Sequence, residues 1–456
     1  MTPDTDDLLR QPLAAIRAVQ DARLVETLSR CAAGHAYYRR RWREAGVDPA
    51  TVRGVGDLGR LPLTSKQDLL AEPESFRLRC PDLPLHERAL WEVIHTTGST
   101  GAPTPIYVTT HDFHADLFQA RRTAAIVGIR DTDVLANLFP LTPAAMGSFV
   151  RAAHNAYATG AAVAAALTGA PHGRFGIHRA LDDAVALVAR HRATVLWGVT
   201  SFVRRVIVRA AELGADFSSV RLCAVTGEAS SPAMREDMRA RLRALGVARP
   251  VIFDRYGSTE AGAMAQCREE GDWHNPAPEL LYHEVVDPGT GRPLPDGERG
   301  LLALTQLDRR GTVLLRYVLG DVVSLTHEPC PHCGRNGDRL VGPVERTHEL
   351  IKVKGMLLSP ALLQAEIRAV PGVDEFQVVL TRRDPADPHS MDELVLRVAT
   401  HRADRDTLAA TLVAAAAAAT GVRPRVEFTQ ADEIYDPAKH VKAERFVDRR
   451  EASERP

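Results

Sequence analysis

TVLWGVTSFVRRVIVRAAELG, residues 194–214, decides the fold class, because a short β-rich run passes directly into an amphipathic helical stretch. The same order repeats in RLCAVTG (221–227) with SPAMREDMRARLRALG (231–246), and PVIFDRYG (250–257) supplies a third β-rich run. Apolar residues of the helical stretches recur at i, i+3 and i+4. Such alternation is typical of βαβ units, so we predict an α/β fold with a mostly parallel, doubly wound sheet.

The flanking regions extend this pattern and then change it. Upstream, DVLANLF (133–139) and LDDAVALVARHRA (181–193) add another strand and helix, and residues 8–46 have helical spacing. Downstream, residues 279–325 contain short strands broken by the turns PGTG, PDG and RRG. This segment predicts an antiparallel or small β-barrel-like subdomain.

A third pattern of strands and helices begins near residue 346. ELIKVKG (349–355) resembles a strand, and the next helix opens with Ser359 as N-cap and Pro360 at its first position. The remaining pattern follows a β-α-β-β-α-β order. We therefore predict a large N-terminal domain over 1–345 and a small, mobile α+β C-terminal domain over 346–456.

Composition narrows the functional classes. The 456 residues carry 57 basic and 58 acidic side chains, a formal net charge of −1, which disfavours nucleic-acid binding and adhesion to an acidic membrane. The chain has no apolar run of 18 residues and no secretory signal pattern at its start. Six cysteines are too sparse for a disulfide scaffold. We expect a cytoplasmic protein, a monomer or a homodimer.

The strongest local motif is HTTGSTGAPT, residues 95–104, which follows the apolar run ALWEVI. Glycines let backbone N–H groups approach an anion, and the hydroxyl side chains add donors. The loop is not a Walker A motif, because no GKS or GKT follows it. Taken by itself, it is equally compatible with a flexible Ser/Gly-rich turn.

Four weaker motifs follow in order. FDRYGSTE (253–260) places a carboxylate beside a hydroxyl and a glycine after a β-run, a pattern suited to Mg²⁺ held near phosphates. RYVLGD (316–321) offers an aspartate for ribose hydroxyls. RTHELIKVKG (346–355) lies at the predicted domain boundary, and HVKAERFVDRR (440–450) carries Lys442.

Together and in this order, the five motifs resemble those of the adenylate-forming superfamily, in particular its phenylacetate–CoA ligase-like branch. The resemblance covers roughly residues 60–450. It implies that the chain uses ATP to convert a carboxylic acid, aromatic or small and biosynthetic, into an acyl-adenylate. The acyl group would then pass to a thiol, most simply that of coenzyme A.

The resemblance also implies roles for individual residues. Thr259, Glu260 and Lys442 would be catalytic, with Glu260 binding Mg²⁺ and Lys442 contacting the oxygens where charge develops. Asp321 would hold the ribose, and Tyr256 would stack on adenine. The full set expected to bind ATP is Thr96, Thr97, Gly98, Ser99, Thr100, Gly101, Thr104, Gly227, Glu228, Ala229, Asp254, Tyr256, Gly257, Ser258, Arg316, Asp321 and Arg346.

Several positions depart from the family pattern. Glu345 replaces the glycine of the hinge motif, and His348 stands where the family has its hinge acid. Val441 precedes Lys442 in place of glycine, and the nearby Lys439 is an alternative catalytic lysine. The segment after residue 139 also differs, so we expect a substrate other than phenylacetate. The residues expected to line its acyl pocket are Phe139, Gly147, Trp197 and Val199.

A separate signal comes from the turn Cys330-Pro-His-Cys333 and the upstream pair Cys267 and His274. Three cysteines and one histidine can form a closed, tetrahedral structural zinc site, here within a subdomain around 265–335. His332 and His327 are alternative fourth ligands. A reduced surface turn without metal is the other interpretation.

Two further functions stay open at this stage. The adenylated acid could pass to a carrier-protein thiol or an amine, or the chain could be a catalytically silent nucleotide-binding homologue. Retention of Glu260, Asp321 and Lys442 favours an active enzyme, because a protein that only binds nucleotide need not keep all three.

Overall fold

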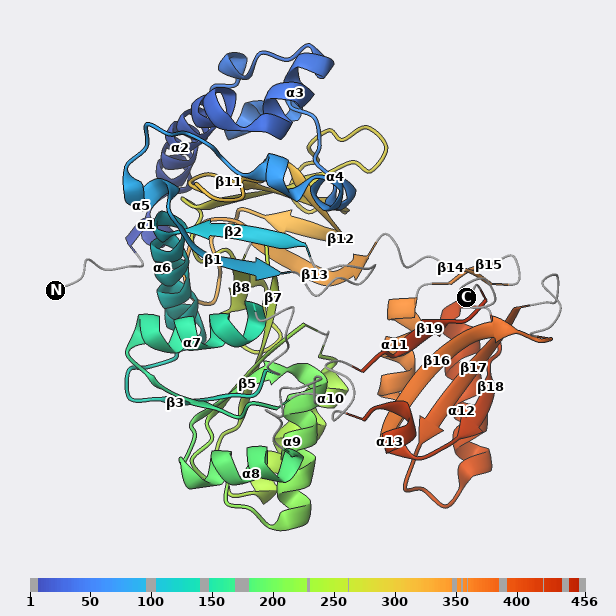
Figure 1. Ribbon diagram of the computed structural model, residues 1–456. Helices are drawn as coiled ribbons and strands as arrows, with labels where there is room; N and C mark the ends of the chain where they lie inside the picture. Colours follow the sequence, from blue (N-terminus) through green and yellow to red (C-terminus); the bar gives the residue numbers. More distant parts are fainter. Residues whose placement is uncertain are drawn as a thin grey trace, which may run out of the picture.

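The computed structural model describes residues 7–95, 104–139, 147–168, 180–227, 230–260, 262–346, 351–353, 356–358, 360–384, 392–420, 422–436 and 443–450. A larger N-terminal part lies beside a smaller C-terminal part (Figure 1). Among the described residues, no helix combines the length and the apolarity needed to cross a bilayer.

Eleven described strands form one sheet in the order β10-β11-β12-β13-β9-β8-β7-β6-β5-β3-β4. Its parallel half consists of β3 (Val134–Asn137), β4 (Ala162–Ala165), β5 (Val195–Val199), β6 (Leu222–Thr226) and β7 (Val251–Ser258). The helices of this half are α6 (Thr110–Val127), α7 (Gly147–Thr159), α8 (Leu181–Arg190), α9 (Thr200–Leu213) and α10 (Pro232–Ala244). This arrangement confirms the predicted α/β class.

The antiparallel half continues the same sheet. It consists of β8 (Gly262–Gln266), β9 (Trp273–His274), β10 (Leu281–Val286), β11 (Gly300–Gln306), β12 (Tyr317–Thr326) and β13 (Arg339–Arg346). The strands predicted as a separate barrel-like unit are therefore joined to the parallel half. The connection is the antiparallel pairing of β7 with β8, which reverses the chain between Ser258 and Gly262.

Glycine is required at this reversal for two reasons. Gly262 has φ +77°, and a Cβ there would lie 2.3 Å from Oε1 of Gln119 on α6. A Cβ on Gly257 would lie 2.4 Å from the carbonyl oxygen of Gly262. Only glycine permits both the left-handed backbone and these approaches, so the reversal at the end of β7 is fixed by sequence.

The N-terminal helices cover the antiparallel half (Figure 1). They are α1 (Asp7–Arg10), α2 (Leu13–Gly34), α3 (Ala36–Ala45), η1 (Pro49–Thr51), η2 (Val55–Arg60), α4 (Lys66–Ala71), η3 (Pro73–Phe76) and α5 (Leu85–Arg88). Polar contacts attach α2 to distant segments, because Gln20 donates to the Pro278 carbonyl at 3.0 Å and Thr27 to the Leu307 carbonyl at 2.6 Å. The predicted helices of residues 8–46 are confirmed.

The hairpin of β1 (Leu90–His95) and β2 (Pro105–Thr109) brackets the hydroxyl-rich motif. The two strands are antiparallel, with His95 opposite Pro105. Residues 96–103 lie outside the described residues, so the motif is placed only by its two ends.

The C-terminal part has its own sheet, in the order β18-β17-β16-β19, and its own buried core, which includes Leu363, Phe376 and Leu396. Its elements are β14 (Ile351–Val353), β15 (Met356–Leu358), α11 (Pro360–Ala369), β16 (Glu375–Arg382), β17 (Asp392–Ala399), α12 (Arg405–Thr420), β18 (Arg425–Phe428), α13 (Ala431–Ile434) and β19 (Phe446–Asp448). Arg205 on α9 donates to the Tyr435 carbonyl at 2.8 Å, which links the two parts.

Candidate active site

The candidate site lies where the parallel half of the sheet meets the antiparallel half. Tyr256 is near the end of β7, and Asp321 lies on β12. The Tyr256 hydroxyl donates to Oδ2 of Asp321 at 2.6 Å, and the Asp321 side chain is buried. Two motifs predicted separately from the sequence are thus in direct contact.

Glu260 follows β7 and is also buried, with 7% of its surface exposed. Its Oε1 accepts a hydrogen bond from the Tyr317 hydroxyl at 3.4 Å, and its backbone carbonyl accepts one from Nε2 of Gln306 at 2.7 Å. Burial, followed by the charge of Glu260, raises the pKa of Tyr317, so this phenol stays protonated and donates. No described residue forms an ion pair with Glu260, which leaves its charge available to a cation.

Thr259 lies beside the end of β1 and the start of α7. A Cβ built on Gly147, the first residue of α7, would lie 2.7 Å from Cγ2 of Ile94 and 3.7 Å from Cγ2 of Thr259. The missing side chain at Gly147 therefore allows close packing of these three segments. The hydroxyl-rich motif begins at His95, directly after Ile94, so its first residue lies close to Thr259.

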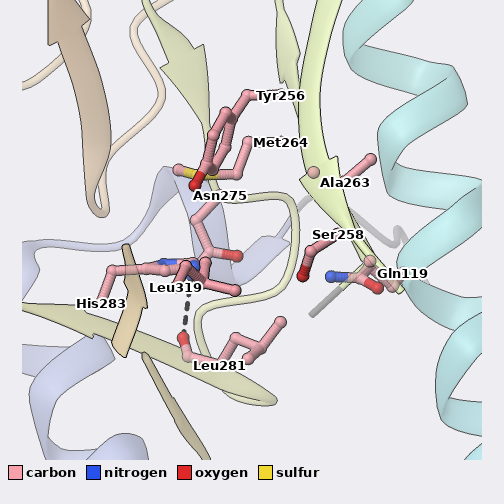
Figure 2. Close-up of a pocket in the computed structure, with 11 residues that line it drawn as sticks. Gln119, Tyr256, Ser258, Ala263, Met264, Asn275, Leu281, His283 and Leu319 are labelled. Atoms are coloured by element: carbon pink, nitrogen blue, oxygen red, sulfur yellow. Dashed lines mark hydrogen bonds between the residues drawn. The ribbon is translucent and has the colours of Figure 1, made fainter. Parts of the chain in front are cut away.

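A small pocket lies behind the YGSTE segment. Figure 2 shows Ser258 and Gln119 pointing toward one another across it, with Asn275 and His283 on another wall. Asn275 donates to the Leu281 carbonyl at 2.9 Å, and Nδ1 of His283 lies 2.6 Å from Oδ2 of Asp338. Burial opposes ionisation of Asp338, but the contacts with His283 and Asn275 hold its pKa below the ordinary value.

A second pocket connects Glu260 with a buried ionic group that the sequence did not predict. Asp116 on α6 contacts Nη1 of Arg151 at 2.5 Å and Nη2 of Arg309 at 2.5 Å, and Asp116 and Arg309 line the pocket together with Glu260. Burial would raise the pKa of Asp116, but the two guanidinium groups keep it below the ordinary value. Arg309 lies in the RRG turn, and its partner is 193 residues away, so sequence spacing gave no signal for the pair.

Asp254 lies within β7, and Gly227 directly follows the neighbouring strand β6. Asp254 accepts hydrogen bonds from the backbone N–H and hydroxyl of Ser230, at 3.3 and 3.0 Å. Burial raises its pKa to about 6, although the bonds from Ser230 act in the opposite direction. Gly227 follows β6 with φ +82°. Glu228 and Ala229 lie outside the described residues, and Asp254 anchors the segment directly after them.

Arg316 does not point toward this cluster. Its guanidinium forms a bidentate ion pair with Glu284, at 2.9 and 3.2 Å, and donates to the carbonyls of Leu61 and Gly291. Buried protein acceptors thus occupy the guanidinium in this structure, and the expected role of Arg316 in ATP binding stays a prediction. The contacts also hold Arg316 at φ +47°, an uncommon conformation for a side chain of this size.

The other expected ATP ligands divide into placed and unplaced residues. Thr104 is buried at the start of the segment that leads into β2. The backbone of Arg346 pairs with Asp321 across β13 and β12, but its side chain is not described. The residues outside the described ranges are Thr96, Thr97, Gly98, Ser99, Thr100, Gly101, the hinge residue His348, and both lysine candidates, Lys439 and Lys442.

Three of the four expected acyl-pocket residues lie in or just after parallel strands, and the fourth, Gly147, begins α7. Phe139 follows β3, and Trp197 and Val199 belong to β5; all three are buried. The Leu138 N–H donates to the Trp197 carbonyl at 2.8 Å, which places the end of β3 beside β5. Ligands of open α/β sheets bind at these strand ends.

The four predicted zinc ligands converge at the outer side of β8 and β9. The ligand atoms of Cys267, His274, Cys330 and Cys333 all lie within 4.8 Å of one another. The two sulfurs of Cys267 and Cys330 are 3.8 Å apart, and Nε2 of His274 is 3.3 Å from Sγ of Cys267. Burial, followed by Arg339 and Arg335, lowers the pKa of His274 to about 4, so the imidazole is neutral and keeps a lone pair for a metal.

The two alternative histidines do not belong to this group. His332 is exposed, and His327 contacts Asp296 at 2.8 Å. The turn is closed by Gly334, which has φ +67° and donates its N–H to the Cys330 carbonyl at 2.8 Å.

Comparison with known proteins agrees with this geometry. Residues 22–306 match the family model described as AMP-binding enzyme. A phenylacetate-coenzyme A ligase of Thermus thermophilus is 29% identical over 398 residues, which are 87% of this chain and 83% of the relative. A phenylacetate-coenzyme A ligase of Escherichia coli is 26% identical and covers 82% of each chain.

A solved structure supports the fold. That structure is of a 2-hydroxyisobutyryl-CoA ligase in the postadenylation state, in complex with R3-HIB-AMP. Its TM-score is 0.82 at 22% identity, and the superposition covers 99% of this chain and 94% of that chain. With more than half of its length matched by the family model, the chain belongs to the AMP-binding enzyme family.

Proposed function

We propose that the protein is an AMP-forming acid–thiol ligase that activates a carboxylic acid with ATP and transfers the acyl group to coenzyme A. The contact between Tyr256 and Asp321 carries this proposal, together with the buried carboxylate of Glu260, which forms no ion pair with a described residue. The site thus contains Asp321, a group suited to bind ribose, and Glu260, a group suited to bind a cation on the phosphates. The coenzyme A ligases among the relatives support the same chemistry.

Two steps account for the overall reaction. A carboxylate oxygen attacks the α-phosphorus of ATP and pyrophosphate leaves, which gives an acyl-adenylate. A thiolate sulfur then attacks the acyl carbon and AMP leaves. Asp321 would bind the ribose hydroxyls. The Tyr256 hydroxyl would hold the Asp321 carboxylate in place, and the Tyr256 ring would stack on the adenine. Thr259 and the hydroxyl-rich motif would contact the phosphates.

Mg²⁺ fits Glu260, because this buried carboxylate lacks an ion pair with any described residue and faces a pocket lined with further polar groups. When bound, the ion would neutralise negative charge on the phosphates. We assign to Lys442 the role of stabilising the charge that develops on the reacting oxygens, since a cation aimed at that charge lowers the barrier.

The alternatives differ from this proposal in the acceptor of the acyl group, which would be a carrier protein or an amine, or in having no activity. Pyrophosphate release would be measured with a panel of acids, with and without coenzyme A, together with thioester formation. We expect release with a subset of acids and a coenzyme A thioester as product. Release without any thioester would favour a carrier protein or an amine as acceptor, and failure of every acid would reject an active ligase.

We further propose that Cys267, His274, Cys330 and Cys333 bind one structural zinc ion. Tetrahedral zinc with bonds of about 2.3 Å to sulfur places two sulfurs about 3.8 Å apart, which is the separation of Cys267 and Cys330. A disulfide would require about 2.05 Å. Four protein ligands complete the coordination shell, so the ion would stabilise the fold without taking part in the reaction.

This zinc site would connect three distant segments. Cys267 follows β8, His274 belongs to β9, and the cysteine turn lies between β12 and β13. Arg10 donates to the Cys333 carbonyl at 2.5 Å, so the same turn also contacts the start of the described chain. Loss of the ion would therefore loosen the antiparallel half of the sheet behind Tyr256 and Glu260.

A further inference from the structure

Arg255 is a buried cation on β7, directly before the sequence YGSTE (256–260). Only 8% of its surface is exposed, and its guanidinium lies over the ring of Trp197, 4.2 Å from the centroid. Its Nε has no hydrogen-bond partner, and no described carboxylate forms an ion pair with it. Burial lowers the pKa of Arg255 to about 9, and no neighbouring charge among the described residues offsets this effect.

Several other buried arginines of this chain pair with carboxylates, whereas Arg235, like Arg255, forms no ion pair with a described residue. Arg122 pairs with Glu279 at 2.7 Å, Arg310 with Glu87 at 2.5 Å, and Arg316 with Glu284 at 2.9 Å. A buried charge without a partner is costly, because the lost hydration is not replaced by a counter-ion. The ring of Trp197 compensates for only part of that loss. Among the described residues, no carboxylate therefore balances the charge of the Arg255 guanidinium.

The position of Arg255 indicates which anion would balance this charge. In the parallel half, Val199 on β5 pairs with Thr226 on β6, and Thr226 pairs with Arg255 on β7. In-register neighbours point to the same face of a sheet, so Arg255 shares a face with Val199 and Trp197, the residues expected at the acyl pocket. Its neighbour Tyr256 points to the other face and contacts Asp321.

The end of β7 therefore separates two regions. The Tyr256 side chain lies on the face of the expected nucleotide, and the Arg255 side chain lies on the face of the expected acyl group. The strand ends at Ser258, directly before Thr259 and Glu260, where the two substrates would react. An anionic group that binds Arg255 would therefore be part of the acid substrate. It would lie away from the carboxylate of that substrate that reacts with ATP.

We propose that the acid activated by this protein is a dicarboxylic acid, whose second carboxylate binds Arg255. This inference rests on the proposed ligase function. A guanidinium matches a carboxylate through two parallel N–H···O bonds, and such a pair is strong in a buried site. An acid with a methyl group in place of the second carboxylate would leave the guanidinium without an anion.

The test uses stable mimics of the acyl-adenylate, N-acylsulfamoyl adenosines, in matched pairs. The pairs are succinyl with butyryl, glutaryl with pentanoyl, adipoyl with hexanoyl, and 4-carboxybenzoyl with 4-methylbenzoyl. Calorimetry would give Kd for the wild type, Arg255→Met, Arg255→Lys and the control Arg249→Met, whose side chain is exposed.

We expect one carboxylate-ended mimic to bind the wild type about 100-fold more tightly than its partner, because a site built for a polar group strongly disfavours an analogue that lacks it. Arg255→Met should reverse this preference, Arg255→Lys should keep part of it, and Arg249→Met should not change it. If Arg255→Met does not fold, the wild-type ratio and the Arg255→Lys variant still decide the question.

The outcomes distinguish the two proposals. Tight binding of methyl-ended mimics, with no carboxylate-ended mimic preferred, would overturn the dicarboxylic acid and leave the ligase function intact. A preference that persists unchanged in Arg255→Met would remove Arg255 from the site. Failure of every mimic to bind the wild type would reject the ligase function itself.

Discussion

The hydroxyl of Tyr256 donates a 2.6 Å hydrogen bond to Oδ2 of Asp321, although the two residues are 65 positions apart. This bond connects β7, the last parallel strand, with β12 of the antiparallel half. A carboxylate that already accepts one hydrogen bond is restricted in orientation. The relationship leads directly to a test of the nucleotide site.

Asp321→Asn should weaken ATP binding more than Tyr256→Phe. Hydrogen bonds to charged groups contribute more than neutral ones, so we expect about a 10- to 100-fold increase in Kd for Asp321→Asn and about 2- to 10-fold for Tyr256→Phe. Calorimetric titration with ATP measures both, and Tyr157→Phe, at an exposed tyrosine, serves as the control. A larger effect of Tyr256→Phe would contradict the assignment of Asp321 to the ribose.

Glu260→Gln should raise the Mg²⁺ concentration needed for pyrophosphate release. An amide of the same shape keeps the hydrogen bond with Tyr317 but lacks the charge that holds the ion. The matched control is Tyr317→Phe, which removes the hydroxyl and keeps the carboxylate. An unchanged Mg²⁺ dependence in Glu260→Gln would exclude this residue from the ion's ligands.

Lys442→Ala should reduce pyrophosphate release by about 100- to 1,000-fold, since one donor to developing charge is worth that much. The fold should be retained, because the C-terminal part has its own core around Phe376 and Leu396. Thermal unfolding checks the fold, and Lys439→Ala is the control. A near wild-type rate in Lys442→Ala, with a large loss in Lys439→Ala, would move the role to the alternative lysine.

Cys330→Ser and His274→Ala should lower the zinc content and the thermal stability together. Elemental analysis of protein purified without chelator should give about one zinc per wild-type chain and close to none in these variants. His332→Ala and Cys80→Ser, both outside the cluster, should retain the metal. A zinc-free wild type would disprove the site, and loss of zinc in His332→Ala would change its ligand set.

The stability of the protein should fall between pH 6.5 and pH 4 because of His35. This histidine is fully buried, its Nδ1 accepts from the Tyr38 N–H at 3.3 Å, and its Nε2 lies 3.3 Å from the Val313 carbonyl. Burial lowers its pKa to about 4, so the unfolded chain takes up the proton first as the pH falls. The stabilising contribution is complete above pH 6.5 and is lost on acidification toward pH 4.

Urea unfolding at a series of pH values measures this effect, which amounts to a few kcal/mol, about 1.4 per unit of pKa. His35→Asn keeps an acceptor at the start of α3 and should flatten the pH profile. His86→Asn, at an exposed histidine, should leave the profile unchanged. An equally steep profile in His35→Asn would assign the acid sensitivity to other groups.

Local patterns were sufficient for much of this fold. The β-rich runs around Trp197 and Cys223 alternate with periodic helices, and that periodicity determines a parallel sheet. The spacing of Cys330 and Cys333 similarly predicted two ligands on one turn. Both properties depend on residues that are close in the chain.

Contacts between distant segments were not accessible in this way. The ion pair of Arg309 with Asp116 joins residues 193 positions apart, and the ion pair of Arg316 with Glu284 joins residues 32 positions apart. Whether the strands of 279–325 formed a barrel or extended the sheet depended on the pairing of β7 with β8. Tertiary packing determines such pairings, and it produces no periodic pattern in a single sequence.

The docking of the first helices also sets an order of events during synthesis. Asn336 donates its backbone N–H to the Leu9 carbonyl and its side-chain amide to the Gln11 carbonyl, and α2 is attached at Gln20 to Pro278. These partners leave the ribosome roughly 300 residues after the helices, which takes roughly 15 to 60 s at about 5 to 20 residues per second. Throughout that interval α2 can pack against the neighbouring α3, η1 and η2, but its native partners among residues 278–336 are still missing, so the side of α2 that faces them stays uncovered.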